Sequence, residues 1–224
     1  MRIVNVEQGS EEWEALRRGV PTASNLGEIV TPAKGQLSSS AERYAAKLIA
    51  QSHGVVIPPP PSFWMQWGID TEPYAVKAYE TITDRTTEKI GFVWGDGERY
   101  GCSPDRFVGT DGILEVKCPM PETVVEYHLN GELPLAYKPQ VQGQLLITER
   151  EWCDFIAYHP ELKPFLIRVE RDEKYIAAIQ VALDEFCEML DSFREKLSTL
   201  GEKVAVELTD NYQPMDYEVS EVQL

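Results

Sequence analysis

The feature that most constrains this chain is an acidic motif split across a predicted β-hairpin. Asp105 follows one strand, and Glu115 lies ten residues later on the next, two residues before Lys117. Side chains two apart on a strand point to the same face, so Glu115 and Lys117 are expected side by side. The hairpin brings Asp105 opposite Glu115. Two carboxylates and an amine around one point are the groups needed for metal-assisted cleavage of a phosphodiester bond.

Either half of this motif alone is weak evidence, because such short patterns are common in turns and on exposed strands. Glu115, however, interrupts an apolar strand, where a charge is costly without a purpose. In a two-metal site Asp105 would be the bridging ligand, with Glu115 and the carbonyl of Val116 as further oxygen ligands. Lys117 would orient and activate the attacking water.

Hydrophobic periodicity and turn residues predict helices around a run of strands. Helices are expected over residues 11–18, 22–29, 41–51, 121–129, 136–148 and 172–200, with one more ending near 81. Strands are expected over 89–94, 100–103, 107–108, 113–118, 152–158 and 165–169. The four prolines at 58–61 predict an extended segment. At least two of Phe63, Trp64 and Trp67 are expected in the core. The order predicts an α/β fold with a central mixed β-sheet flanked by helices.

Length and charge suggest how the chain is divided. Its 224 residues are 43% hydrophobic, which suits one domain over 1–200 with an acidic C-terminal extension over 201–224. The net charge of −16 gives no support to DNA binding. Much of this negative charge lies in the C-terminal part, which has 14 acidic and 5 basic residues from Glu170 onward. Any basic surface must therefore be local.

Composition also bounds the cellular setting. The chain has no run of eighteen apolar residues, and its N-terminus lacks the apolar core of a signal peptide, so no membrane span and a cytoplasmic location are expected. The four cysteines are widely spread and predict free thiols rather than disulfides or a zinc ribbon.

Several further motifs surround the hairpin in a distinctive order. They are Val6-Glu7-Gln8-Gly9, Trp13, Leu16 to Ser24, Trp67-Gly68 with Glu72, Cys102 to Asp105, Leu114 to Pro119, Gln140-Val141-Gln142 and Glu170 to Tyr175. Together they resemble the phage lambda-type exonucleases, also called YqaJ-like viral recombinases, of the PD-(D/E)xK nuclease superfamily. The resemblance spans about residues 7–175 and implies a restriction-endonuclease-like core.

The resemblance extends the predicted site beyond the hairpin. Glu72 matches the family's upstream acidic residue near the metals, and Gln140 matches the first glutamine of its QxQ motif. Without the resemblance, each would be an ordinary polar helix residue. The implied cofactor is a pair of Mg²⁺ ions, with Mn²⁺ as a substitute.

The resemblance also implies a DNA-end site. Arg17 and Ser24 match the family's pocket for a 5′-terminal phosphate, and Ser103 is expected to belong to the same DNA-binding surface. An arginine fork and a hydroxyl near a helix N-terminus suit a phosphate. Without the resemblance, Arg17 would indicate a surface charge and Ser24 a helix cap. Met65 falls where the family places an apolar wedge that parts the strands, although core packing also suits a methionine.

The implied activity is a 5′-to-3′ double-strand DNA exonuclease that leaves 3′ overhangs for recombination by strand annealing. The family forms homotrimeric rings that thread DNA and works with a single-strand annealing protein, in bacteria and their phages. A ring would let an acidic protein hold DNA through enclosure.

Three other functions remain open at this stage. One is a sequence-specific endonuclease of the same superfamily, for which an end-phosphate pocket has no use. Another is the helicase-linked type of nuclease with an iron–sulfur cluster, although Cys102 and Cys118 lie inside the nuclease core rather than bracketing it. The last is a non-catalytic DNA-end-binding scaffold.

Overall fold

A five-stranded mixed sheet forms the centre of the computed structural model, which describes residues 1–55 and 63–200. The strand order is β2 (Thr87–Lys89), β5 (Arg106–Val108), β6 (Gly112–Lys117), β7 (Trp152–Ala157) and β8 (Phe165–Glu170). β6 and β7 are parallel and the other neighbours antiparallel. The proline segment and the acidic extension predicted from the sequence lie outside the described residues.

A second, three-stranded sheet lies beside the first and was not predicted. Its order is β1 (Arg2–Val4), β3 (Phe92–Trp94) and β4 (Gly101–Cys102). The single strand predicted over 89–94 is therefore two strands in different sheets. Gly91 lies at the break, where an added Cβ would be 2.5 Å from the carbonyl oxygens of Val4 and Val6. Only glycine lets the chain cross from one sheet to the other this close to a neighbouring backbone.

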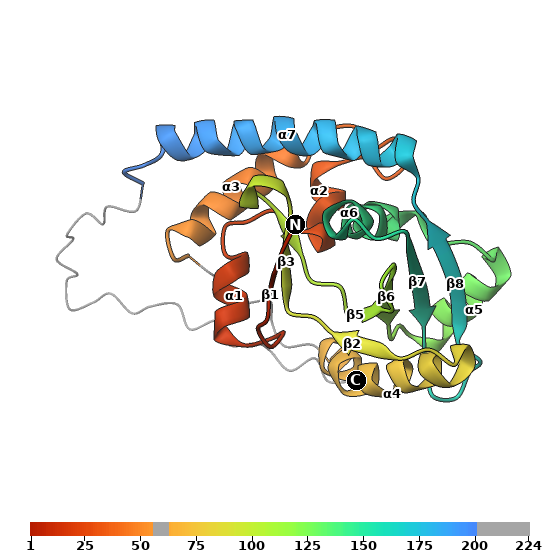
Figure 1. The fold of residues 1–224 in the computed structure, drawn as a ribbon. Helices are drawn as coiled ribbons and strands as arrows, with labels where there is room; N and C mark the ends of the chain where they lie inside the picture. The colour runs from red at the N-terminus through yellow and green to blue at the C-terminus, as the bar shows by residue number, and fades with distance from the viewer. Residues whose placement is uncertain (56–62, 201–224) are drawn as a thin grey trace, which may run out of the picture.

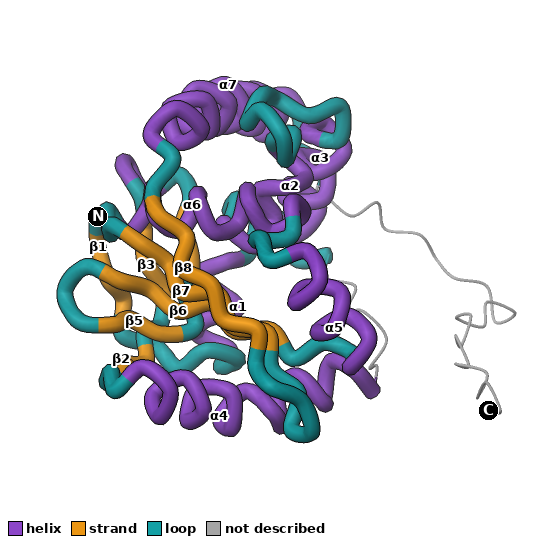
Figure 2. Tube along the Cα trace, turned by 90° about the vertical axis from the view of Figure 1, so that its right-hand side faces the viewer, coloured by secondary structure: helices purple, strands orange, loops and turns teal. Residues whose placement is uncertain are grey.

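Helices cover both faces of the central sheet (Figures 1 and 2). α4 (Phe63–Thr83) lies on one side, and α6 (Lys138–Thr148) lies on the other, beneath α2 (Leu26–Ile29), α3 (Ala41–Ser52) and α7 (Glu173–Lys196). α1 (Glu11–Arg17) and α5 (Pro121–Asn130) lie at the sides. Short 3₁₀ turns are η1 (Ala23–Asn25), η2 (Asp96–Glu98) and η3 (Leu135–Tyr137). The mixed α/β fold with a helix-flanked sheet is thus confirmed.

Two helix starts follow from local capping. The Ser10 hydroxyl accepts a hydrogen bond from the Trp13 amide at 3.2 Å, and the Asp172 carboxylate accepts one from the Tyr175 amide at 3.0 Å. The helix predicted over 22–29 is instead the 3₁₀ turn η1 followed by one α-helical turn, and neither Thr22 nor Ser24 caps it through its side chain. The Ser24 hydroxyl is left to contact other groups.

The aromatic residues at the start of α4 are not core residues, contrary to expectation. Phe63 is 70% exposed and Trp64 46% exposed, and only Trp67 is half-buried. The face of α4 that packs on the sheet carries smaller or later residues, from Thr71 to Tyr79. The aromatic side chains instead pack on one another, with the centres of the Phe63 and Trp64 rings 5.0 Å apart.

A buried polar network fastens α4 to the sheet. The Tyr79 hydroxyl donates to Asp154 Oδ2 at 2.7 Å, and Arg168 donates two hydrogen bonds to the same carboxylate at 2.8 Å. Asp154 is 4% exposed, so these partners offset the cost of burying its charge. No helix within the described ranges is long and apolar enough to span a membrane.

Packing at the start of β6 should be sensitive to a single methyl group. A Cβ at Gly112 would overlap the buried indole of Trp152, so Gly112→Ala is expected to lower the free energy of unfolding by about 1–3 kcal/mol. The matched control is Gly27→Ala in α2, where no atom lies within 4 Å of the added Cβ. Urea denaturation would measure both, and equal stability of the two variants would contradict this account of β6.

Candidate active site

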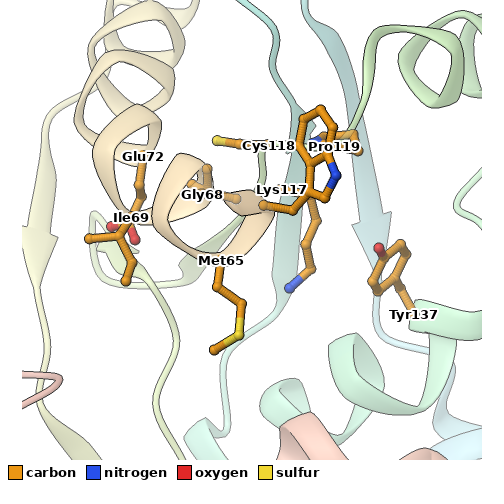
Figure 3. A pocket seen from close by; sticks show the side chains of 10 residues that line it. Met65, Gly68, Ile69, Glu72, Lys117, Cys118, Pro119 and Tyr137 are labelled. Atoms are coloured by element: carbon orange, nitrogen blue, oxygen red, sulfur yellow. The ribbon is translucent and has the colours of Figure 1, made fainter. Parts of the chain in front are cut away.

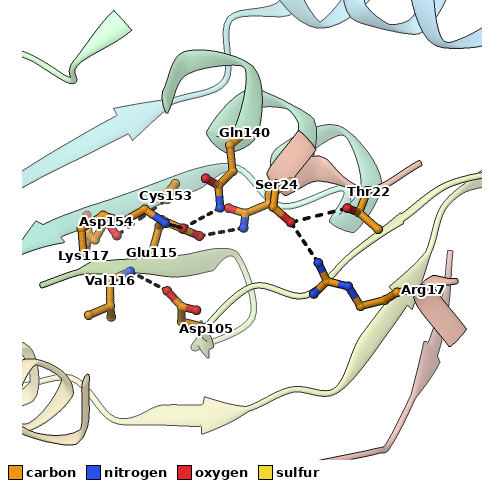
Figure 4. Close-up of polar contacts among 11 residues, drawn as sticks. Arg17, Thr22, Ser24, Asp105, Glu115, Val116, Lys117, Gln140, Cys153 and Asp154 are labelled. Atoms are coloured by element: carbon orange, nitrogen blue, oxygen red, sulfur yellow. Dashed lines mark hydrogen bonds and ion pairs between the residues drawn. The ribbon is translucent and has the colours of Figure 1, made fainter. Parts of the chain in front are cut away.

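The split motif comes together at the β5–β6 hairpin (Figure 4). Asp105 lies just before β5, and its Oδ2 accepts a 2.6 Å hydrogen bond from the backbone amide of Val116. Glu115, in the middle of β6, is 1% exposed. Lys117 lies two residues later on the same face, with its Nζ 2.5 Å from Glu115 Oε1. The structure therefore gathers the two carboxylates and the amine around one point.

Helix α6 supplies two amides to the buried carboxylate. Gln140 Nε2 donates to Glu115 Oε1 at 2.6 Å, and Gln144 Nε2 donates to Glu115 Oε2 at 2.7 Å. Gln140 was predicted from the sequence, but Gln144 was not. The available signal was its spacing, since side chains four apart on a helix share a face. Gln142, between them, faces away and bonds the backbone at the end of β8.

The electrostatics of the cluster show an incompletely compensated anionic pair. Burial, and then the neighbouring Glu115 carboxylate, raise the pKa of Asp105 well above its usual value, despite the opposing effect of Lys117. Burial alone would lower the pKa of Lys117, but the charges of Glu115 and Asp105 and the hydrogen bond to Glu115 outweigh it and raise the pKa. The amine is therefore an ammonium facing the two acidic side chains.

This donor set fits a hard cation. Asp105, Glu115 and the Val116 carbonyl offer only oxygen ligands, which Mg²⁺ prefers, and the raised pKa of Asp105 indicates that further positive charge would be favourable. Across residues 1–55 and 63–200, no three His, Cys, Asp or Glu side chains are grouped closely enough to hold a metal. Any metal here would therefore rely on two carboxylates and backbone oxygen or water.

Glu72 lies beside the cluster but is engaged elsewhere. Its Oε1 is 3.0 Å from Arg106 Nη1, and the same nitrogen donates to the Asp105 carbonyl at 2.5 Å. Arg106 therefore ties α4 to the start of β5. The structure brings Glu72 near the predicted site, as an ion-pair partner of Arg106.

A cavity of about 550 Å³ opens next to the cluster, between α4 and the end of β6 (Figure 3). Met65 and Glu72 line it from α4, Lys117 from β6 and Tyr137 from η3. Met65 is 50% exposed, so it is not a core residue. Met65 therefore lines the same cavity as Lys117.

The predicted end-phosphate residues form a second polar cluster. Arg17 Nη2 donates to Ser24 Oγ at 3.3 Å, and the Arg17 guanidinium lies 3.9 Å from the centre of the Trp13 ring. Trp13 Nε1 in turn donates to Ser103 Oγ at 2.8 Å. Ser103 precedes Asp105 by two residues, so this chain of contacts runs from Ser24 toward the carboxylates. Sequence reasoning assigned Trp13 no role here.

The cysteines are held as thiols. All four lie within the described residues, are free, and are buried except for the half-buried Cys118. Burial, and then the charges of Glu72 and Asp105, raise the pKa of Cys118 to about 12. Burial likewise raises the pKa of Cys187 to about 11. At neutral pH neither group is a thiolate.

The sequence-family model of the YqaJ-like viral recombinase domain matches residues 12–151, which include every predicted site residue. The chain belongs to this family. No curated protein sequence matches it.

Solved structures agree with this assignment. An alkaline exonuclease, LHK-Exo from Laribacter hongkongensis, is 33% identical with a TM-score of 0.77, over 88% of this chain and 100% of that one. The same enzyme in complex with dAMP is 32% identical with a TM-score of 0.75, over 85% and 100%. A phage-related exonuclease from Haemophilus somnus 129PT, 14% identical with a TM-score of 0.65 over 80% and 96%, shares the fold. The two structures that are more than 30% identical are thus of an alkaline exonuclease, in agreement with the exonuclease family that the sequence motifs predicted.

Removing one charge from the carboxylate pair should stabilise the metal-free protein. Asp105→Asn retains an oxygen to accept the Val116 amide but removes the repulsion of Glu115, so an increase of about 1 kcal/mol in the free energy of unfolding is expected in EDTA. Urea denaturation of both proteins would measure it. A variant less stable than wild type under these conditions would show that the two carboxylates do not repel each other.

Proposed function

We propose that this protein is a Mg²⁺-dependent double-strand DNA exonuclease that degrades the 5′-phosphorylated strand from 5′ to 3′ and leaves 3′ overhangs for recombination by strand annealing. The observation that carries the proposal is the convergence of Asp105, Glu115 and Lys117 beside an open cavity. Family membership and the exonuclease relatives support hydrolysis of DNA from an end.

In this proposal the cation is held by Asp105, Glu115 and the Val116 carbonyl, with Glu72 as a further acidic group on the α4 side. When bound, Mg²⁺ supplies Lewis-acid polarisation of the scissile phosphate and lowers the pKa of water nearby, and Mn²⁺ can replace it. We propose two such ions because the family resemblance implies a pair.

The protein groups then have separate tasks. The Lys117 ammonium, half-exposed to the cavity, orients the attacking water and offsets negative charge on the phosphate. Gln140 holds the Glu115 carboxylate through its hydrogen bond to Oε1. Met65, an exposed side chain that lines the cavity, would act as the apolar wedge that separates the terminal base pair.

The Arg17 cluster gives the enzyme its end preference. A guanidinium and the exposed Ser24 hydroxyl can bind a terminal phosphate through charge-assisted hydrogen bonds. Stacking on Trp13 holds the guanidinium in place, and the Trp13–Ser103 bond connects this cluster to the loop that carries Asp105. An endonuclease has no use for such a pocket.

The assembly and partners are proposed on family resemblance. A homotrimeric ring in the bacterial or phage-infected cytoplasm would enclose the duplex, so that a chain with a net charge of −16 can hold DNA. A single-strand annealing protein would receive the 3′ overhang.

Digestion of matched DNA substrates tests the proposed activity. In Mg²⁺, a linear duplex with 5′-phosphates should be degraded at least about 10-fold faster than the same duplex with 5′-hydroxyls, and a closed circle should remain intact. End-labelled strands would show loss from the 5′ end. Cutting of the circle would instead identify an endonuclease, and binding without any product would identify a scaffold.

The control for the end pocket compares two adjacent arginines. Arg17→Ala should reduce the preference for the 5′-phosphate while retaining the slower digestion of the hydroxyl substrate. Arg18→Ala changes an exposed neighbour and should retain the preference. Equal behaviour of the two variants would place the phosphate site elsewhere.

Lys117→Ala tests the chemistry itself. The variant should fold, because Glu115 still receives both glutamine amides, and should bind DNA, yet its cleavage rate should fall by about 100-fold or more. Single-turnover digestion would measure the rate, with Lys47→Ala on the exposed face of α3 as the control. Full activity of the Lys117 variant would contradict the proposed mechanism.

A further inference from the structure

We infer that Gln144 is a positioning residue that fixes the Glu115 carboxylate for cation binding; this inference rests on the proposed function. Gln144 is 1% exposed and donates from Nε2 to Glu115 Oε2 at 2.7 Å. Gln140 and Lys117 both contact the other oxygen, Oε1. Gln144 is thus the described side chain that restrains Oε2, and it blocks rotation of the carboxylate about its last bond.

The orientation of the Gln144 amide is dictated by Glu115. Gln144 Oε1 is buried and has no hydrogen-bond partner among the described residues. An unsatisfied buried acceptor costs about 1–3 kcal/mol, so the amide would turn if the opposite orientation were better. Turning it would place the amide oxygen against a carboxylate oxygen and leave Glu115 without this donor. The orphan oxygen is therefore evidence that donation to Glu115 governs this side chain.

The backbone beneath Gln144 is held firmly. Gly143 packs so closely on Leu26 of α2 that an added Cβ would overlap that side chain. One turn farther on, the Thr148 hydroxyl donates to the Gln144 carbonyl at 2.7 Å. A donor on a fixed helix can hold a carboxylate in one orientation, and groups that orient a metal ligand typically change affinity or activity 10- to 100-fold when mutated.

Gln142 provides a matched comparison on the same helix. It is 2% exposed, but it donates to the Glu170 carbonyl at 2.9 Å and accepts from the Asp172 amide at 2.9 Å. It therefore fastens α6 to the β8–α7 connection and does not contact Glu115. Two buried glutamines two residues apart thus have different partners, one the carboxylate and the other backbone.

Calorimetric titration of the metal-free, full-length protein with MnCl₂ tests the inference without relying on cleavage. Gln144→Met keeps the volume but removes the donor, and Gln144→Asn keeps an amide one methylene too short to reach Oε2. Both should bind Mn²⁺ about 10-fold or more weakly than wild type, whereas Gln142→Met should bind as wild type does. In digestion assays the Mg²⁺ concentration for half-maximal rate should rise in parallel, with the KM for DNA unchanged.

Each outcome of this experiment is decisive. Wild-type Mn²⁺ affinity in a folded Gln144 variant would overturn the inference, as would an equal loss in Gln142→Met, which would indicate general loosening of α6. If the methionine variant does not fold, the asparagine variant decides. If the wild-type protein itself neither binds Mn²⁺ nor digests DNA, the proposed function is refuted. If the wild-type protein does both and the Gln144 variants behave in the same way, only the inference about Gln144 is refuted.

Discussion

The buried carboxylate of Glu115 is the interaction on which the arrangement of this molecule depends. A charge that is 1% exposed in the middle of a strand needs partners on every side. β6 supplies Lys117, and α6 supplies two amides, so the strand and the helix must meet at this point. The close packing of α2 on Gly143 then holds α6 in place. The position of α6 against β6 is thus tied to the requirements of one charged group.

The partners of Glu115 leave the charge of its neighbour Asp105 incompletely compensated. Partners surround Glu115, but Asp105 has a raised pKa because burial and its neighbour's charge act on it together. Native proteins keep such strain where function needs it. In the proposed nuclease a cation relieves it, so stability and activity would make opposite demands on the same residue.

Much of this fold was predictable from the sequence because the signals are local. The strand from Gly112 to Lys117 and the long helix α7 follow from apolar periodicity and turn residues, and the hairpin that joins Asp105 to Glu115 follows from chain spacing. The break at Gly91 was missed, because it depends on the backbone of Val4 and Val6, about ninety residues earlier.

The prediction of the site from residue spacing also succeeded where the residues are close in sequence and failed where they are distant. Asp105, Glu115 and Lys117 are close in sequence and were found by spacing, whereas Arg17 and Glu72 depended on family resemblance. The exposure of Phe63 and Trp64 could not be read from hydrophobicity, because it depends on which part of α4 packs against the rest of the fold. Gln144 went unnoticed because a buried glutamine has meaning only when its acceptor is known.

The parallel pairing of β6 and β7 has a consequence for how the site assembles. Parallel neighbours require a crossover, and here the crossover contains α5, η3 and α6. Among the described residues, the groups bonded to the Glu115 side chain all come from one continuous stretch, from Lys117 to Gln144. Closing a loop of roughly forty residues costs little more entropy than closing a shorter one. The Arg17 cluster joins from the distant N-terminal region, where Thr22 bridges to Gly101. The carboxylate cluster is thus built from one stretch of the chain, and the Trp13–Ser103 hydrogen bond connects the N-terminal Arg17 cluster to it.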